Sequence, residues 1–264
     1  MNAEPGNPLC VIEAPKLNDR MKWISLGMLA VTLASCAPTS LSLGTNVNSP
    51  VDLLPKTPEK GRLFTYYQPR AQSKWHNNWT LPLDLTGVSW NDSRTATLIS
   101  RSHVAMAAHY MRDSHTPVMF HDRNGKPYER YIVSTKVLNG VGDIAIGKLN
   151  MPLPKEIHSY RLADAADATK GKAVIITDQT MTASIHRIGA VYGKGIGFEY
   201  HPDIDPIYQR NLIVGDSGNP TFLLKNGELM LLETHTTGGP GAGPFYGDPE
   251  VQAAVRKAMS ELGN

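Results

Sequence analysis

The most informative stretch of this sequence is Val214-Gly215-Asp216-Ser217-Gly218-Asn219-Pro220, a run of small residues with one hydroxyl. Glycines flank an Asp-Ser pair, and glycine allows the main chain to bend sharply. The N–H groups of Gly215 and Ser217 can then converge on one point as an oxyanion hole beside a serine nucleophile. The alternative is an ordinary surface turn, because Gly, Asp, Ser, Asn and Pro are the residues that dominate turns. This stretch by itself fits both interpretations.

A histidine and an aspartate upstream favour the catalytic interpretation over the surface turn. A serine hydroxyl is a weak nucleophile near neutral pH, so it needs a general base, and that base needs an orienting carboxylate. His109 ends the apolar run Val104-Ala105-Met106-Ala107-Ala108, and Asp143 precedes the β-type run Ile144-Ala145-Ile146. The separations of 34 and 74 residues leave room for several strands around each group.

In this order the three stretches resemble the signatures of the trypsin/chymotrypsin-like serine peptidases, A-A-H, D-I-A-L and G-D-S-G-G-P, and the resemblance spans about residues 80–262. It implies that His109 is the general base, Asp143 its partner and Ser217 the nucleophile, with the Gly215 and Ser217 amides as the oxyanion hole. It also implies an all-β, chymotrypsin-like fold of two six-stranded antiparallel barrels with a C-terminal helix. Two positions depart from the family: Asn219 replaces the second glycine after the serine, and Tyr110 stands where many relatives have cysteine.

Short strands separated by turns are expected through residues 79–264, the predicted peptidase domain. The first barrel, about 79–155, has strand composition at 95–99, 118–120, 131–137 and 144–149, and the second, about 156–247, at 173–176, 185–191, 196–200 and in a hairpin over 222–234. Asp248-Pro249-Glu250 then predicts a helix start, and the apolar residues after it recur at helical spacing. We expect a helix over 248–262 that packs on the second barrel.

The N-terminal residues 1–36 are predicted to be an extension and a secretory signal. Lys22 precedes an apolar run of about a dozen residues, which is shorter than the roughly 20 that span a membrane. Met21 is the better start, because the polar segment 1–20 would displace the signal from the N-terminus. Leu33-Ala34-Ser35-Cys36 resembles a bacterial lipobox, so Cys36 is expected to carry a lipid. An ordinary cleaved signal with an incidental cysteine is the alternative.

Residues 37–78 are predicted to be a tether that lifts the domain from a membrane surface. They are rich in Ser, Thr, Asn and Pro and show no long helical or strand periodicity. Tyr66, Tyr67 and Trp75 suggest that the distal part packs on the domain.

Composition narrows the class of protein. The chain has 264 residues, 41% of them hydrophobic and 19% charged, as in ordinary globular proteins. A formal charge of +2 without a Lys/Arg cluster argues against nucleic-acid binding. The two cysteines, Cys10 and Cys36, lie outside the catalytic region, so no disulfide is expected there, which points to a bacterial relative. His103, His109, His115 and His121 recur every six residues, but zinc sites favour shorter spacing, so no metal or other cofactor is predicted.

Substrate-contacting residues follow from the family resemblance. Asn211 and Leu212 stand where the primary specificity pocket is expected, and His235, Thr236 and Gly238 where its other wall begins. A histidine before this wall is similar to the arrangement in glutamyl endopeptidases, which suggests an acidic side chain in the pocket. The alternative is a strand histidine whose ring nitrogens bond to its neighbours.

We therefore expect a lipid-anchored serine endopeptidase of the bacterial cell envelope, facing the periplasm or exterior, which acts as a monomer on proteins or peptides. Two alternatives remain: a catalytically inactive relative that binds peptides or proteins in the old cleft, and an esterase. Many family members need a freed Ile/Val N-terminus to pair with the Asp before the nucleophile, and no basic site followed by Ile-Val-Gly-Gly is present. Asp216 must find another partner.

Overall fold

The computed structural model describes residues 46–90 and 94–263. These residues belong to one compact unit. The predicted signal segment and Cys36 lie outside the described residues. Within the described ranges, no helix is both long and apolar enough to cross a bilayer.

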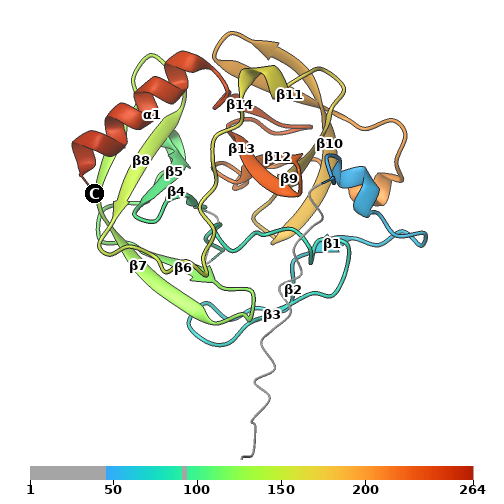
Figure 1. Cartoon of the computed structure of the whole chain (residues 1–264), viewed down its shortest axis with the longest axis horizontal. Helices are drawn as coiled ribbons and strands as arrows, with labels where there is room; N and C mark the ends of the chain where they lie inside the picture. Colours follow the sequence, from blue (N-terminus) through green and yellow to red (C-terminus); the bar gives the residue numbers. More distant parts are fainter. Residues whose placement is uncertain (1–45, 91–93, 264) are drawn as a thin grey trace, which may run out of the picture. The chain divides into compact units, whose positions relative to one another are not determined.

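Two antiparallel sheets form the body of this unit (Figure 1). The first has the order β4-β5-β8-β7-β6. Its strands are β4 (Thr97–Ser100), β5 (His103–Ala107), β6 (Pro117–His121), β7 (Pro127–Val137) and β8 (Ile144–Leu149). An isolated bridge between Val88 and Thr97 extends this sheet beyond β4.

The second sheet has the order β13-β12-β9-β10-β11-β14, and β1 pairs with β10 outside that path. Its strands are β1 (Gly61–Arg62), β9 (Ala173–Thr177), β10 (Thr182–Tyr192), β11 (Gly195–Tyr200), β12 (Pro220–Lys225), β13 (Glu228–Thr234) and β14 (Ala242–Pro244). A separate hairpin pairs β2 (Phe64–Tyr66) with β3 (Lys74–Trp75), and the short 3-10 helices are η1 (Pro50–Leu53), η2 (Ala108–Tyr110), η3 (Ala165–Asp167) and η4 (Pro206–Tyr208).

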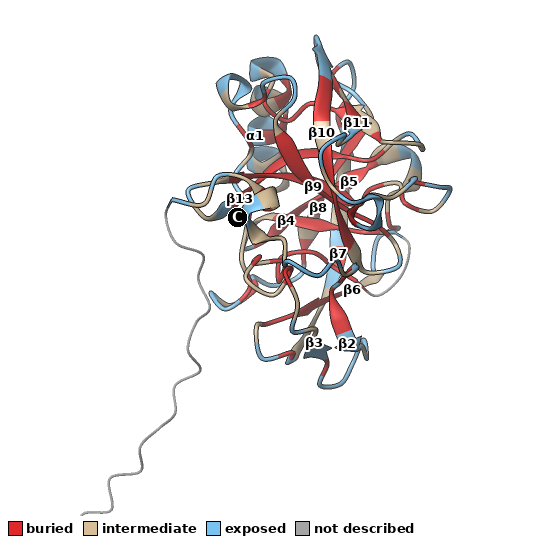
Figure 2. Ribbon diagram, turned by 90° about the vertical axis from the view of Figure 1, so that its right-hand side faces the viewer, coloured by how far each residue is buried: buried red, intermediate tan, exposed pale blue. Residues whose placement is uncertain are grey.

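The almost continuous apolar runs of the central strands reflect burial on both faces. Side chains alternate across a strand. In β12, Phe222 and Leu224 enter a core shared by the two sheets, whereas Leu223 enters a second core inside its own sheet. In β8, Ile144 and Ile146 enter the shared core, and Ala145 packs inside the first sheet. Buried segments accordingly run through the centre in Figure 2.

The predicted all-β fold with a C-terminal helix is confirmed: two curled antiparallel half-barrels form the domain. The sheets have five and seven strands in place of the expected six each. The seventh strand of the second sheet is β1, which comes from the predicted tether. The hairpin expected at Asn226-Gly227 is present, and both residues have positive φ, +52° and +78°, as tight β12–β13 turns favour.

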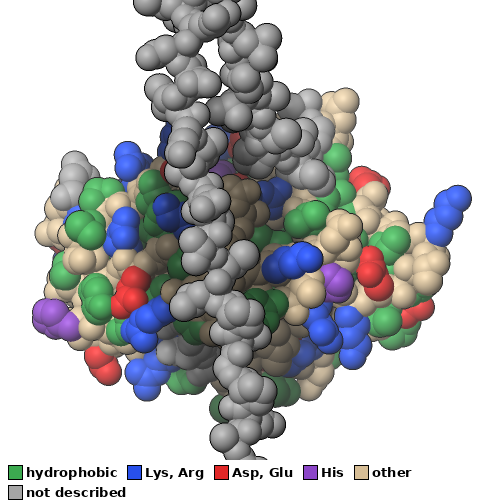
Figure 3. Space-filling model, turned by 90° about the horizontal axis from the view of Figure 1, so that it is seen from below, with side chains coloured by type: hydrophobic (Ala, Val, Ile, Leu, Met, Phe, Trp, Pro, Cys, Tyr) green, Lys and Arg blue, Asp and Glu red, His purple; other side chains and the backbone are tan. Residues whose placement is uncertain are grey.

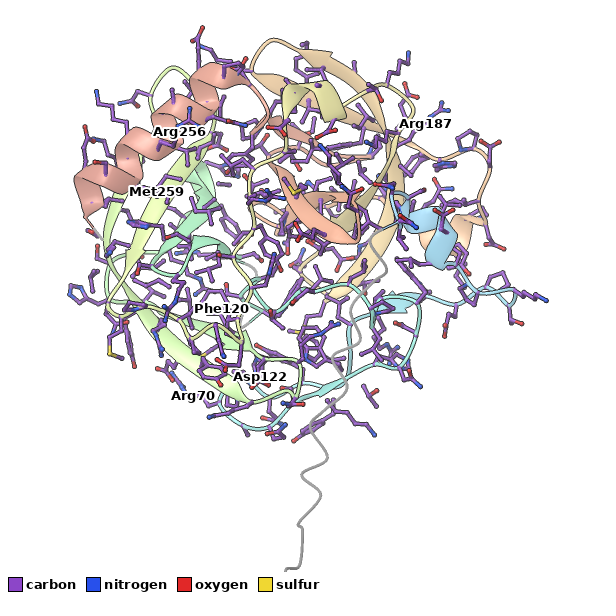
Figure 4. All side chains as sticks on the ribbon, viewed as in Figure 1. Arg70, Phe120, Asp122, Arg187, Arg256 and Met259 are labelled. Atoms are coloured by element: carbon purple, nitrogen blue, oxygen red, sulfur yellow. The ribbon has the colours of Figure 1, made fainter. Side chains whose placement is uncertain are left out.

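The C-terminal helix α1 (Pro249–Leu262) begins as predicted. The Asp248 carboxylate accepts hydrogen bonds from the Glu250 and Val251 amides, and Pro249 is the first helical residue. The expected packing on the second barrel is incomplete, because α1 also lies against β7 and β8 of the first sheet, while Glu250 pairs with Lys194 of the second. One reason is electrostatic: Lys148 Nζ donates to the Gly263 carbonyl oxygen at 2.7 Å, at the negative end of the helix. Met259 and Arg256 of α1 are labelled in Figure 4, with Phe120 and Asp122 at the end of β6.

The tether predicted over residues 37–78 is too long, because its described part is folded into the domain. In its described part, Leu63 and Phe64 are buried in the shared core, with Tyr67 and Trp75 packed against it, and β1 pairs with β10. Residues 46–78 therefore belong to the domain, although Tyr66 is 55% exposed. The aromatic residues in this polar segment indicate from the sequence that it packs on the domain. The pairing of β1 with β10 cannot be predicted in this way, because the two strands are more than a hundred residues apart and leave no local periodicity.

The described surface is mixed in charge. On the face in Figure 3, Lys and Arg side chains are scattered among acidic, hydrophobic and neutral ones.

Candidate active site

Strand register brings His109 and Asp143 together. β5 and β8 are antiparallel neighbours, with Ala107 opposite Ile144. His109 follows β5 in η2, and Asp143 immediately precedes β8, so the two residues lie side by side at the same end of the sheet. The backbone N–H of His109 donates to Asp143 Oδ1 at 2.8 Å. This bond fixes the carboxylate under the imidazole.

The three predicted catalytic side chains form one hydrogen-bonded chain. His109 Nδ1 donates to Asp143 Oδ2, and the Ser217 hydroxyl lies 3.0 Å from His109 Nε2. A carboxylate only accepts, so it places the ring proton on Nδ1 and leaves Nε2 free to accept the proton of Ser217. The His109 side chain is 49% exposed, which lets a substrate approach it.

The backbone of the loop that carries Ser217 is compatible with the predicted oxyanion hole. Gly215 and Gly218 have φ of +99° and +86°, a region that side chains disfavour. Within the described chain, the N–H groups of Gly215 and Ser217 donate to no acceptor, whereas those of Asp216, Gly218 and Asn219 are all bonded. Two unpartnered amides next to the nucleophile are the donors that a developing oxyanion requires.

Asp216, 1% exposed, is held by backbone amides. Its carboxylate accepts from the N–H of Gln179 at 3.0 Å and from that of Ile213 at 2.8 Å. A buried carboxylate needs such donors, because leaving it unpaired is costly. The Gln179 and Ile213 amides are therefore the partners of Asp216 that the sequence analysis could not name, and neither belongs to a freed N-terminus.

Asn219 fits its position through its side chain. It is fully buried, accepts from the Thr95 hydroxyl at 3.0 Å, and donates through Nδ2 to the Asp216 carbonyl at 3.1 Å. Thr95 lies just before β4, so this amide connects the nucleophile loop to the first sheet. The departure from glycine thus adds a link between the two halves of the site.

A cavity of about 550 Å³ is lined by His109 and Ser217 on one side. Its lining includes three of the predicted substrate-contacting residues, Leu212, Thr236 and Gly238. Asn211 does not line it: its side chain accepts from the Tyr200 hydroxyl at 3.0 Å and faces neighbouring cavities. The Leu212 and Gly239 backbones pair with each other, which joins the segment of Leu212 to the segment that follows Gly238.

His235 does not line this cavity either. It is 1% exposed, its Nδ1 lies 3.0 Å from Glu233 Oε2, and its Nε2 lies 3.2 Å from the Thr177 carbonyl oxygen. Burial is the largest single influence and lowers the pKa of His235, but the Glu233 and Asp216 carboxylates and the Thr177 carbonyl together raise it overall. Both ring nitrogens are engaged, so the expectation that His235 receives an acidic substrate side chain does not fit its position.

Three supporting residues escaped the sequence analysis: Gln179, Glu233 and Thr95. Glu233 is fully buried and binds both His235 and the Thr221 hydroxyl, at 2.7 Å from the latter. A charged residue at the end of the apolar run 229–232 was the one available signal of a buried pair. Gln179 and Thr95 contact residues that are more than 30 positions away in the sequence, and such contacts leave no pattern in the sequence.

The strand order and the Ser-His-Asp chain at the junction of two half-barrels define a chymotrypsin-like domain, the fold of the trypsin-like serine peptidases. No family model matches the sequence, and no curated protein matches it. Among solved structures, Kallikrein-related peptidase 10 is similar at 17% identity and a TM-score of 0.48, over 64% of this chain and 92% of that one.

Proposed function

We propose that this domain is a serine endopeptidase that hydrolyses peptide bonds in proteins through an acyl-enzyme on Ser217. One observation carries the proposal: His109 contacts both Asp143 and Ser217, next to two amides without acceptors in the described chain. Nucleophile, base, orienting carboxylate and oxyanion donors are the complete set for acyl transfer.

Acylation follows from these positions. As Ser217 Oγ attacks the substrate carbonyl carbon, its proton passes to His109 Nε2, and the carbonyl oxygen becomes an oxyanion facing the Gly215 and Ser217 amides. Asp143 stabilises the imidazolium that forms. His109 then gives its proton to the departing amine nitrogen as the C–N bond breaks, which leaves an ester on Ser217.

Deacylation repeats the sequence with water. His109 removes a proton from a water molecule that attacks the ester carbonyl, and the same two amides face the second oxyanion. When the ester C–O bond breaks, His109 returns the proton to Ser217 Oγ and the carboxylic acid product leaves. No cofactor takes part in either half.

Labelling of the full chain with a fluorophosphonate probe tests the proposal, with Ser217→Ala as the matched control. The phosphorus reacts only with an activated serine, so we expect labelling of the wild type and none of the control. Circular dichroism shows whether both are folded. A folded wild type that stays unlabelled contradicts the proposal and favours a peptide-binding relative without catalysis.

We also propose that Cys36 anchors the protein to a membrane of the bacterial cell envelope through a lipid. Support comes from the apolar run that ends in Leu33-Ala34-Ser35-Cys36. Growth with an alkynyl palmitate should label the wild type and leave Cys36→Ala unlabelled. Equal labelling of both would refute the anchor.

A further inference from the structure

A turn of the second sheet lies against the nucleophile loop. It joins β9 to β10, and Gln179 stands at its tip. The side-chain Nε2 of Gln179 donates to the Val214 carbonyl oxygen at 2.9 Å, and its backbone N–H donates to Asp216 Oδ1 at 3.0 Å. One residue thus holds the loop on both sides of Gly215.

The bond to Val214 also sets the direction of the Gly215 N–H. These two groups belong to the same peptide unit, which is planar and trans, so the carbonyl and the N–H point in opposite directions. While Gln179 holds the Val214 oxygen on its own side, the Gly215 N–H must face the other way. A rotation of this peptide would withdraw one of the two oxyanion donors.

Packing does little to hold this peptide. The Val214 side chain is 99% exposed, and Ile213 is 53% exposed. Gln179 also lies directly on Gly215: a Cβ at position 215 would stand 2.5 Å from Gln179 Oε1. The tip of the loop is therefore positioned by hydrogen bonds and by contact with the Gln179 side chain.

The turn itself is firmly anchored. The buried Asp178 carboxylate accepts from the Thr180 N–H at 2.7 Å and from its hydroxyl at 2.6 Å. Arg210 Nε lies 2.9 Å from the other Asp178 oxygen. Because the turn is tied to its own backbone and to the segment that precedes Leu212, Gln179 acts from a fixed base.

We propose that Gln179 is a positioning residue of the oxyanion hole, whose side-chain amide keeps the Gly215 N–H turned toward the substrate carbonyl. This inference rests on the proposed function, since it concerns the same reaction. Gln179 touches no reacting atom.

The test is Gln179→Met in the full chain, with p-nitrophenyl acetate as the probe. Methionine keeps the length of the side chain and the backbone N–H to Asp216, but it cannot donate to Val214. Gln252→Met is the matched control, because Gln252 Nε2 likewise donates to a backbone carbonyl, that of Ala163 at 3.0 Å, from helix α1. The burst of p-nitrophenol counts competent sites, so the acylation rate is obtained per folded enzyme.

We expect the acylation rate per site to fall about tenfold in Gln179→Met, the effect of one lost hydrogen bond, while the substrate dissociation constant obtained from the burst phase stays unchanged. The fall should stay below the roughly hundred- to thousandfold of losing an oxyanion donor outright. The acylation rate of Gln252→Met should equal that of the wild type. An unchanged rate in Gln179→Met, or an equal fall in both variants, overturns the inference. If the wild type shows neither a burst nor fluorophosphonate labelling, the proposed function fails instead.

Discussion

We expect the buried residue His186 to make the stability of this domain fall at acid pH. The residue lies on β10 and is fully buried. Its Nδ1 lies 2.8 Å from the Pro240 carbonyl oxygen, and its Nε2 accepts from the Arg210 N–H at 3.2 Å. These partners suit a neutral ring with its proton on Nδ1, since a proton on Nε2 would face another donor. Burial is the main cause that lowers the pKa of His186 from 6.5 to about 4, and the charge of nearby His235 lowers it further.

The sign follows from proton binding. Between these two values the unfolded chain holds more protons at this site than the folded one, so stability is full above pH 6.5 and is lost as the pH falls toward 4. The whole contribution is on the order of 3 kcal/mol, and about 2 kcal/mol of it is lost between pH 7 and pH 5. His186 joins the segment before Leu212 to the loop before Gly241, so acid should also loosen the walls of the active-site cavity.

Urea unfolding at pH 7 and pH 5, followed by tryptophan fluorescence, measures this effect. His186→Asn retains a donor for Pro240 but cannot titrate, so its free energy of unfolding should fall about 2 kcal/mol less than that of the wild type over this interval. His115→Gln, at an exposed histidine, is the matched control and should behave like the wild type. Burial also lowers the pKa values of His103 and His121, which is why the comparison uses the difference between variants. The reasoning is refuted if His186→Asn and the wild type lose the same stability.

Three further changes are expected to have separable effects. Asp143→Asn should lower the acylation rate about ten-thousandfold, because an amide favours the wrong ring tautomer of His109, while urea unfolding stays unchanged; a loss below tenfold would exclude the orienting role. Gly215→Ala should abolish fluorophosphonate labelling, because its φ is +99° and the new Cβ meets Gln179 at 2.5 Å; normal labelling would show that the loop tolerates another backbone. Asp248→Ala should lower the free energy of unfolding by about 1 kcal/mol through loss of the helix cap, and Asp248→Asn by less; equal values for all three proteins would show that the cap contributes nothing.

Several features were predictable because they depend on near neighbours in the chain. The hairpin at Asn226-Gly227 follows from the positive φ that both residues accept, and the helix start at Asp248 from its capping oxygen and the proline after it. The predicted catalytic chain of His109, Asp143 and Ser217 rested on motif order, and the structure brings these side chains into contact.

Other features escaped prediction because several arrangements suit the same local pattern. The stripe of Val251 and Val255 requires an apolar partner but does not specify which sheet supplies it. The polar segment before residue 79 has the composition of a linker. Its pairing with β10, which shows that it belongs to the domain, depends on residues far along the chain. His235 has the same neighbours in sequence whether it faces a substrate or a buried Glu233.

Most strands after residue 79, the start of the helix and the chemical types at the candidate site thus follow from short stretches of sequence, because backbone preference and side-chain alternation act between near neighbours in the chain. Which of these groups come into contact depends on strand register and packing. Gln179 reaches Val214, Asn219 reaches Thr95, and His235 turns to Glu233 because strand register and packing place them within hydrogen-bond distance. Such contacts join segments far apart in the chain, and the type of a residue does not predict which distant residue it will contact.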